Sequence, residues 1–114
     1  MKVEVTELPG NMVRLDLAGR LDIEGTQKAE TIVSPIVTAR QMRVIFNLSS
    51  VTFMASVGIR LLLSAALAQD GMGGKVVVAM PQGIVRAILE TAGVDQLVPI
   101  YDSLEAAQAG LDFA

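Results

Sequence analysis

Two short runs of apolar residues, at 44–48 and 75–79, each lie between segments whose apolar residues recur with helical spacing. Strands that are apolar on both faces are typical of parallel sheets covered by helices. A strand–helix–strand connection between parallel strands is almost always right-handed, which restricts the available topologies. These runs therefore predict an α/β fold built around parallel strands.

The beginning of the chain shows a different pattern. Residues 3–6 and 13–17 alternate apolar and polar side chains, and Pro9, Gly10 and Asn11 between them are turn residues. This pattern predicts an antiparallel hairpin. The expected sheet is therefore mixed, with an antiparallel start followed by parallel strands.

Helical spacing recurs four times, and the last strand is expected at 97–100. The first helix is expected over 25–39, where Pro35 either kinks the helix or begins a second segment capped by Ser34. The fourth helix follows residues 102–105, which resemble a capping box. The predicted order is β-β-α-β-α-β-α-β-α in one domain over 1–114, with the helices largely on one side of the sheet.

The second helix is expected to begin near Ser56 and to continue through Asp70. Apolar residues on this helix predict its buried face, which we expect to include Leu63. On this interpretation Leu63→Ala lowers the stability by about 2–5 kcal/mol. The apolar residues that mark this helix are Ile59, Leu62, Leu63, Ala66 and Leu67, and Leu63 is expected to share a stripe with Ile59, Ala66 and Leu67.

Composition excludes several classes of function. The 114 residues include no cysteine and no histidine, so the chain can form neither a disulfide framework nor a Ser-His-Asp triad. The net charge of −3 and the lack of clustered basic residues argue against nucleic-acid binding. No apolar run approaches the roughly 20 residues of a membrane span. The N-terminal residues predict a strand and not a signal peptide, so we expect a cytoplasmic protein without direct membrane insertion.

No cofactor or metal is expected. The glycine-rich residues 71–74 follow a helix and precede a strand, whereas a phosphate-binding loop needs the reverse order. Asp22 and Glu24 are close in sequence, but no third ligand accompanies them. A solvated loop is the better interpretation of these two carboxylates.

The residues that follow the first apolar run form the candidate site. Residues 49–58 are expected to form a loop at the carboxyl end of a buried strand, where open α/β sheets place their sites. Ser56 in this loop precedes the helix, where free N–H groups would solvate a phosphate. The alternative is that Ser56 only caps the helix. The loops 22–25 and 80–83 are expected at the same edge.

The ordered series of motifs resembles the STAS domain of anti-sigma-factor antagonists over nearly the whole chain. The residues that carry the resemblance are 19–22, 44–53, Ser56, Gly58, 73–75, 89–93 and 102–105. In that family a serine or threonine of an Asp-Ser-Ser/Thr-Gly loop is phosphorylated by a partner anti-sigma kinase. Ser56 and Gly58 match this loop, while Ala55 and Val57 replace the acid and the second hydroxyl.

The resemblance implies a non-catalytic partner-switching module that binds an anti-sigma factor with serine kinase activity, with Ser56 as the phosphorylation site. The alternative is a STAS interaction subunit that does not switch, in an ABC lipid-transport system or a signalling scaffold. An enzyme is disfavoured because a serine without a general base is a weak nucleophile. The residues do not decide between a monomer and a homodimer. The expected partner-binding residues are Asp22, Met54, Ala55, Ser56, Val57, Gly58 and Ile59.

Overall fold

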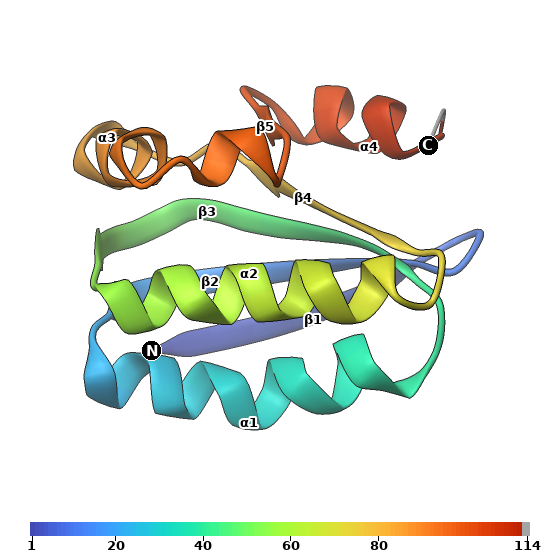
Figure 1. The fold of residues 1–114 in the computed structure, drawn as a ribbon, viewed down its shortest axis with the longest axis horizontal. Coiled ribbons are helices and arrows are strands. Elements are labelled where there is room, and N and C mark those ends of the chain that lie inside the picture. The colour runs from blue at the N-terminus through green and yellow to red at the C-terminus, as the bar shows by residue number, and fades with distance from the viewer. Residues whose placement is uncertain (113–114) are drawn as a thin grey trace.

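The computed structural model describes residues 1–112, which form a five-stranded sheet in the order β1-β2-β3-β4-β5. Strands β1 and β2 pair antiparallel, and each later pair in this sheet is parallel. Figure 1 shows the long strands side by side. The predicted mixed sheet with an antiparallel start is confirmed. The strands are β1 Lys2–Leu8, β2 Met12–Leu21, β3 Arg43–Met54, β4 Lys75–Ala79 and β5 Ile100–Tyr101.

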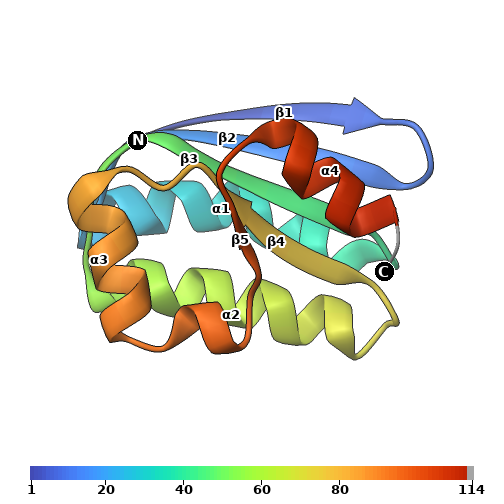
Figure 2. The same cartoon turned by 90° about the horizontal axis from the view of Figure 1, so that it is seen from above.

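Helices cover both faces of this sheet, but unequally. Side chains of α1, α2 and α3 pack into one core with Phe46, whereas α4 packs on the other face against Ile45 and Val77. Figure 2 shows α4 against β4, on the side away from α2. The prediction that the helices lie largely on one side is confirmed. The helices are α1 Ile23–Ala39, α2 Ser56–Asp70, α3 Gly83–Thr91 and α4 Leu104–Asp112, with a 3₁₀ turn at Val94–Gln96.

Helix α1 continues through Pro35 as one helix, so the alternative of a second segment beginning at Ser34 does not form. Pro35 cannot donate a hydrogen bond to the carbonyl of Thr31. Both residues are exposed, so solvent can satisfy that carbonyl and the helix tolerates the missing bond.

Strand β3 is longer than its apolar run. Residues 49–54, which the sequence assigned to a loop, belong to β3, and its pairing with β2 continues as far as Leu21 opposite Met54. The register shifts between Asp16 and Ala18 and again between Gly19 and Arg20, and each shift places an extra residue on β3. Such bulges keep two strands paired while breaking the alternation of side chains. The expected loop is reduced to Ala55.

The C-terminal third differs from the sequence pattern in its details. Helix α3 buries Val85 and Leu89, Ala92 after it is exposed, and β5 begins only at Ile100. Ser103 caps α4, because its hydroxyl accepts a hydrogen bond of 3.0 Å from the Ala106 N–H. The expected strand at 97–100 is therefore mostly an irregular segment.

The buried face of α2 includes Leu62 of the predicted apolar pattern, but Leu63 and Leu67 do not belong to it. Leu62 is 0% exposed, whereas Leu63 is only partly buried and Leu67 is 73% exposed. Most turns of α2 carry apolar residues on more than one side, so two stripes have helical spacing. The residues that α2 buries are Gly58, Leu61, Leu62, Ala65 and Gln69.

Leu62→Ala is therefore expected to reduce the free energy of unfolding by about 2–5 kcal/mol, because it opens a cavity in the core. Leu63→Ala is the matched control and should reduce it by only about 1 kcal/mol, since this side chain keeps part of its surface in water. Urea denaturation followed by circular dichroism measures both. Equal losses in the two variants would contradict this assignment of the helix faces.

Candidate functional site

The carboxyl ends of β2 and β3 lie side by side and each leads directly into a helix. Asp22 alone separates β2 from α1, and Ala55 alone separates β3 from α2. The Ala55 N–H donates a hydrogen bond of 2.9 Å to the Leu21 carbonyl, which ties the two strand ends together. The beginnings of α1 and α2 consequently share one edge, at the left of Figure 1.

The loop after β4 begins some distance from this edge, because β4 ends before β3 does. Strand β4 runs in the same direction, but its last residue, Ala79, pairs with Asn47, seven residues before β3 ends at Met54. The expected loop at 80–83 therefore does not lie level with Ser56. It leads into α3, which packs on β3.

Ser56 is the first residue of α2 and is exposed. Ala55 is the N-cap residue, with φ −88° and ψ 173°, and within the described residues no side chain caps this helix. The interpretation of Ser56 as the capping residue is therefore wrong. Its hydroxyl instead lies in the first turn, where helix geometry leaves N–H groups free and the helix dipole is positive.

Asp22 has a structural task at the same edge. Its Oδ1 accepts a hydrogen bond of 2.8 Å from the Gly25 N–H and so caps α1, while Oδ2 lies 3.5 Å from Arg20 Nε. The Gly25 hydrogen bond, helped by the charge of Arg20, holds the pKa of Asp22 below its ordinary value. Because the pKa of Asp22 is lowered in the folded state, the cap stabilises the fold fully at pH values above the ordinary aspartate pKa. This contribution is lost as the pH falls through the lowered value.

Two of the expected contact residues are buried and cannot meet a partner directly. Met54 is 2% exposed and belongs to the core, and Gly58 is also buried. A Cβ on Gly58 would lie 2.9 Å from Leu21 Cβ and 3.0 Å from Met54 Cγ. Gly58 therefore lets α2 approach the strand ends closely, and both residues support the edge from beneath. Ala55, Val57 and Ile59 are partly buried.

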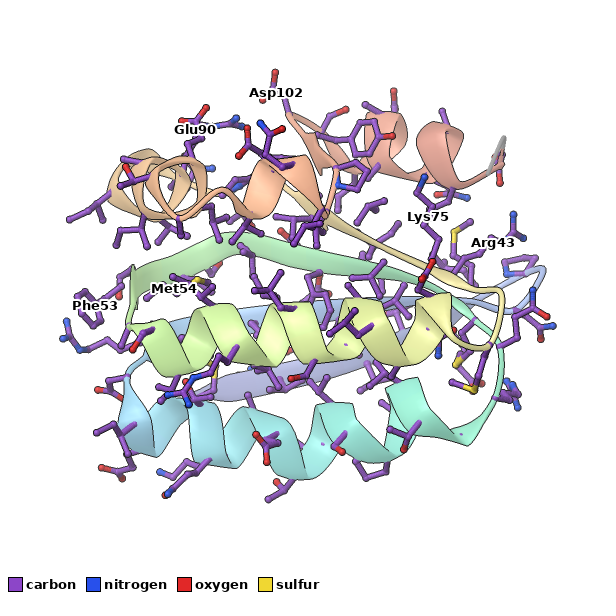
Figure 3. The ribbon with its side chains drawn as sticks, in the orientation of Figure 1. Arg43, Phe53, Met54, Lys75, Glu90 and Asp102 are labelled. Atoms are coloured by element: carbon purple, nitrogen blue, oxygen red, sulfur yellow. The ribbon has the colours of Figure 1, made fainter. Side chains whose placement is uncertain are left out.

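Sequence reasoning missed side chains at the ends of β2 and β3 and at the beginning of α1. The Arg20 guanidinium stacks over the Phe53 ring at 4.4 Å from its centroid, and Figure 3 shows Phe53 at this end of the molecule. Ile23, the first residue of α1, is 67% exposed. Phe53 was assigned to the expected loop 49–58, so its place at the end of a strand was not predicted. Ile23 is an isolated apolar residue before the expected helix and therefore gives no periodic signal.

A groove of about 420 Å³ runs between the first turns of α1 and α2. It is lined by both apolar and charged side chains. The exposed Ser56 begins the helix that forms one of its walls. Residues lining the groove include Ile23, Thr26, Glu30, Val57, Arg60 and Ser64.

The mixed sheet and its helices define a small α/β domain. A family model described as the STAS domain matches residues 2–107, and the chain belongs to the STAS domain family. No curated protein sequence matches the chain.

Solved structures with the same fold come from regulators and from a transporter. The anti-sigma factor antagonist SpoIIAA in its unphosphorylated form is 18% identical with a TM-score of 0.83, over 99% of this chain and 98% of that one. An anti-sigma factor antagonist from Mycobacterium paratuberculosis is 20% identical with a TM-score of 0.87, over 97% and 93%. The murine solute carrier 26 family member A9 anion transporter is 14% identical with a TM-score of 0.78, over 91% of this chain and 18% of that one. At these identities the likeness establishes the fold alone.

Among residues 1–112, no helix is both long enough and apolar enough to cross a membrane. Within the same residues, no group of three acidic side chains comes together as a metal site would require.

Proposed function

We propose that this chain is a non-catalytic regulatory module that binds an anti-sigma factor with serine kinase activity. Partner contact is made by the edge around Asp22, Ala55, Ser56, Val57 and Ile59, and phosphorylation of Ser56 releases the partner. The observation that carries the proposal is the exposed Ser56 hydroxyl in the uncapped first turn of α2.

The site supports a charge on Ser56 without disturbing the fold. A phosphate adds about −1.5 to −2 charges, which the N–H groups of the first helical turn stabilise. A partner that covers the same edge would have to remove water from that charge. An uncompensated buried charge costs several kcal/mol, so the modified form binds more weakly.

The relatives of the same fold support this class of partner. Two of the similar structures are anti-sigma factor antagonists, and one of them is described by its unphosphorylated form. Ser56 and Gly58 match the phosphorylation loop of that family, and the burial of Gly58 against Leu21 gives the motif glycine a physical reason.

A second candidate function is a STAS interaction subunit that binds its partner constantly, as in a transport system or a signalling scaffold. The observation that favours it is Ala55 at the N-cap. Ala55 provides no carboxylate beside Ser56, and Val57 provides no second hydroxyl. A transporter also shares the fold.

Ser56→Asp is expected to keep the fold and to weaken binding to the partner anti-sigma factor at least about tenfold, which corresponds to roughly 1.4 kcal/mol. Ser56→Ala should bind like the wild type and take up no phosphate from the kinase. Calorimetric titration measures the affinities, and mass spectrometry after incubation with ATP locates the phosphate.

Ser34→Asp is the matched control, because Ser34 is exposed on α1 away from this edge. It adds the same charge and should leave the affinity unchanged. Equal affinities for the wild type and Ser56→Asp, together with no phosphate on Ser56, would reject switching and favour the constantly bound subunit.

A further inference from the structure

Arg60 lies one helical turn beyond Ser56 on α2. Residues four positions apart share one face of a helix, with Cβ atoms about 5–6 Å apart. Helical side chains also lean towards the N-terminus, so that a residue covers the turn that precedes its own Cα. Both Ser56 and Arg60 are exposed. The guanidinium of Arg60 can therefore extend over the turn that begins at Ser56.

Arg60 has no carboxylate partner among residues 1–112. Every arginine in this range except Arg40 and Arg60 forms an ion pair with an aspartate. Glu30 on α1 lines the same groove as Arg60, but these two side chains do not form an ion pair. The N–H donors of the Arg60 guanidinium are therefore available to another anion.

The first turn of α2 brings no negative charge between Ser56 and Arg60. This turn contains no acidic residue, and the residues between the two are uncharged. Asp22 lies at the same edge, but its carboxylate faces the Gly25 N–H and Arg20 Nε. No carboxylate of this turn would therefore compete with an anion on Ser56 for the Arg60 guanidinium.

We propose that the Arg60 guanidinium binds the phosphate of phosphorylated Ser56 and holds it against the first turn of α2. This proposal rests on the proposed function, in which Ser56 is the modified residue. A planar guanidinium can donate two parallel hydrogen bonds to one phosphate. The order of the pair is also favourable, because an anion at position i and a cation at i+4 attract each other better than the reverse. Arg60 is thus a positioning residue, which decides where the added charge lies when a partner approaches.

The test uses the whole chain with phosphoserine incorporated at position 56 during translation, so that neither a kinase nor a partner is needed. Phosphorus-31 NMR follows the second ionisation of the phosphate at low ionic strength, because salt screens exposed charges. We expect its pKa to lie below the ordinary value of about 6. Arg60→Gln should raise this pKa by at least about 0.3, because it removes a positive charge that stabilises the dianion.

Arg60→Lys should keep only part of the effect, since lysine keeps the charge but lacks the planar pair of donors. The N–H groups at the beginning of α2 act on the phosphate in every variant, so the differences between the pKa values report on residue 60 alone. Arg60 is exposed, and urea denaturation should therefore show the same stability for Arg60→Gln and the wild type.

Arg40→Gln is the matched control, because Arg40 is the other exposed arginine without an ion pair within residues 1–112. Arg40 follows the end of α1, which Figure 1 shows at the opposite end of the molecule from the beginning of α2. This variant loses the same charge and should leave the phosphate pKa unchanged. Equal pKa values for the wild type and Arg60→Gln, or an equal rise in Arg40→Gln, would overturn the proposal.

A failure of this pairing and a failure of switching are distinguishable. If Arg60→Gln leaves the phosphate pKa unchanged while Ser56→Asp still weakens partner binding, the role of Arg60 is rejected and the proposed function stands. If Arg60→Gln raises the phosphate pKa but the kinase adds no phosphate to Ser56, the pairing stands and the proposed function is rejected.

Discussion

Gln69→Leu is expected to lower the free energy of unfolding by more than about 3 kcal/mol, because it leaves several buried backbone groups without partners. Gln69 is 0% exposed. Its Oε1 accepts a hydrogen bond of 2.7 Å from the Met42 N–H, and its Nε2 donates to the carbonyls of Val37 at 2.7 Å and Arg40 at 3.0 Å. One side chain of α2 therefore joins the end of α1 to the residue before β3.

Guanidinium denaturation of the wild type and Gln69→Leu measures this loss. Gln108→Leu is the matched control, because Gln108 is exposed on α4 and its replacement should change stability by less than about 0.5 kcal/mol. A loss below about 1 kcal/mol for Gln69→Leu would show that other groups satisfy the three backbone atoms.

Gly25→Ala is expected to destabilise the fold by about 1–3 kcal/mol or more, although alanine is the better helix former by about 1 kcal/mol. A Cβ at this position would overlap the Arg20 carbonyl oxygen and would lie 3.1 Å from Asp22 Oδ1. Relief of that overlap requires movement of the backbone. The movement would also disturb the cap that Asp22 forms on α1.

The matched control is Gly71→Ala at the end of α2. Gly71 has a right-handed helical conformation with φ −63°, and the nearest atom to an added Cβ is the Leu67 carbonyl oxygen at 3.5 Å. This change should be neutral or stabilising by about 0.5–1 kcal/mol. Thermal denaturation distinguishes the two variants, and similar melting temperatures for both would contradict the close approach at Gly25.

The topology was predictable because each strand and helix has its own local pattern. The apolar runs at 44–48 and 75–79 and the hairpin turn at Gly10 and Asn11 are properties of short segments, and they suffice for the element order. The beginning of α2 at Ser56 was predictable for the same reason.

The extent of β3 was not predictable from periodicity. Its core positions after Leu48 are Val51 and Met54, so the spacing changes from two residues to three at the bulges. Alternation is the signal for a strand, and a bulge interrupts it. The polar residues of this stretch consequently resembled a loop, and the buried Met54 resembled a surface residue.

The buried side of α2 depends on contacts that are distant in sequence. Leu63 and Leu62 are equally apolar, and only the placement of β4 and the segment around Leu97 leaves Leu63 beside a groove. The burial of Gln69 was also not predictable from the local sequence, because a glutamine near a helix end is normally solvated. Its burial is decided by backbone groups that lie 27 to 32 residues away.

The single-residue connection at Ala55 limits how a modification of Ser56 could act. A flexible loop would let a phosphate shift the population of two backbone conformations. Here the residue before Ser56 is hydrogen-bonded to the end of β2, and the residue two positions later is packed against Leu21. We therefore expect the free modified and unmodified forms to have superimposable backbones. The modification would then weaken binding through the cost of removing water from the added charge at the interface, and no conformational equilibrium within the domain would be needed.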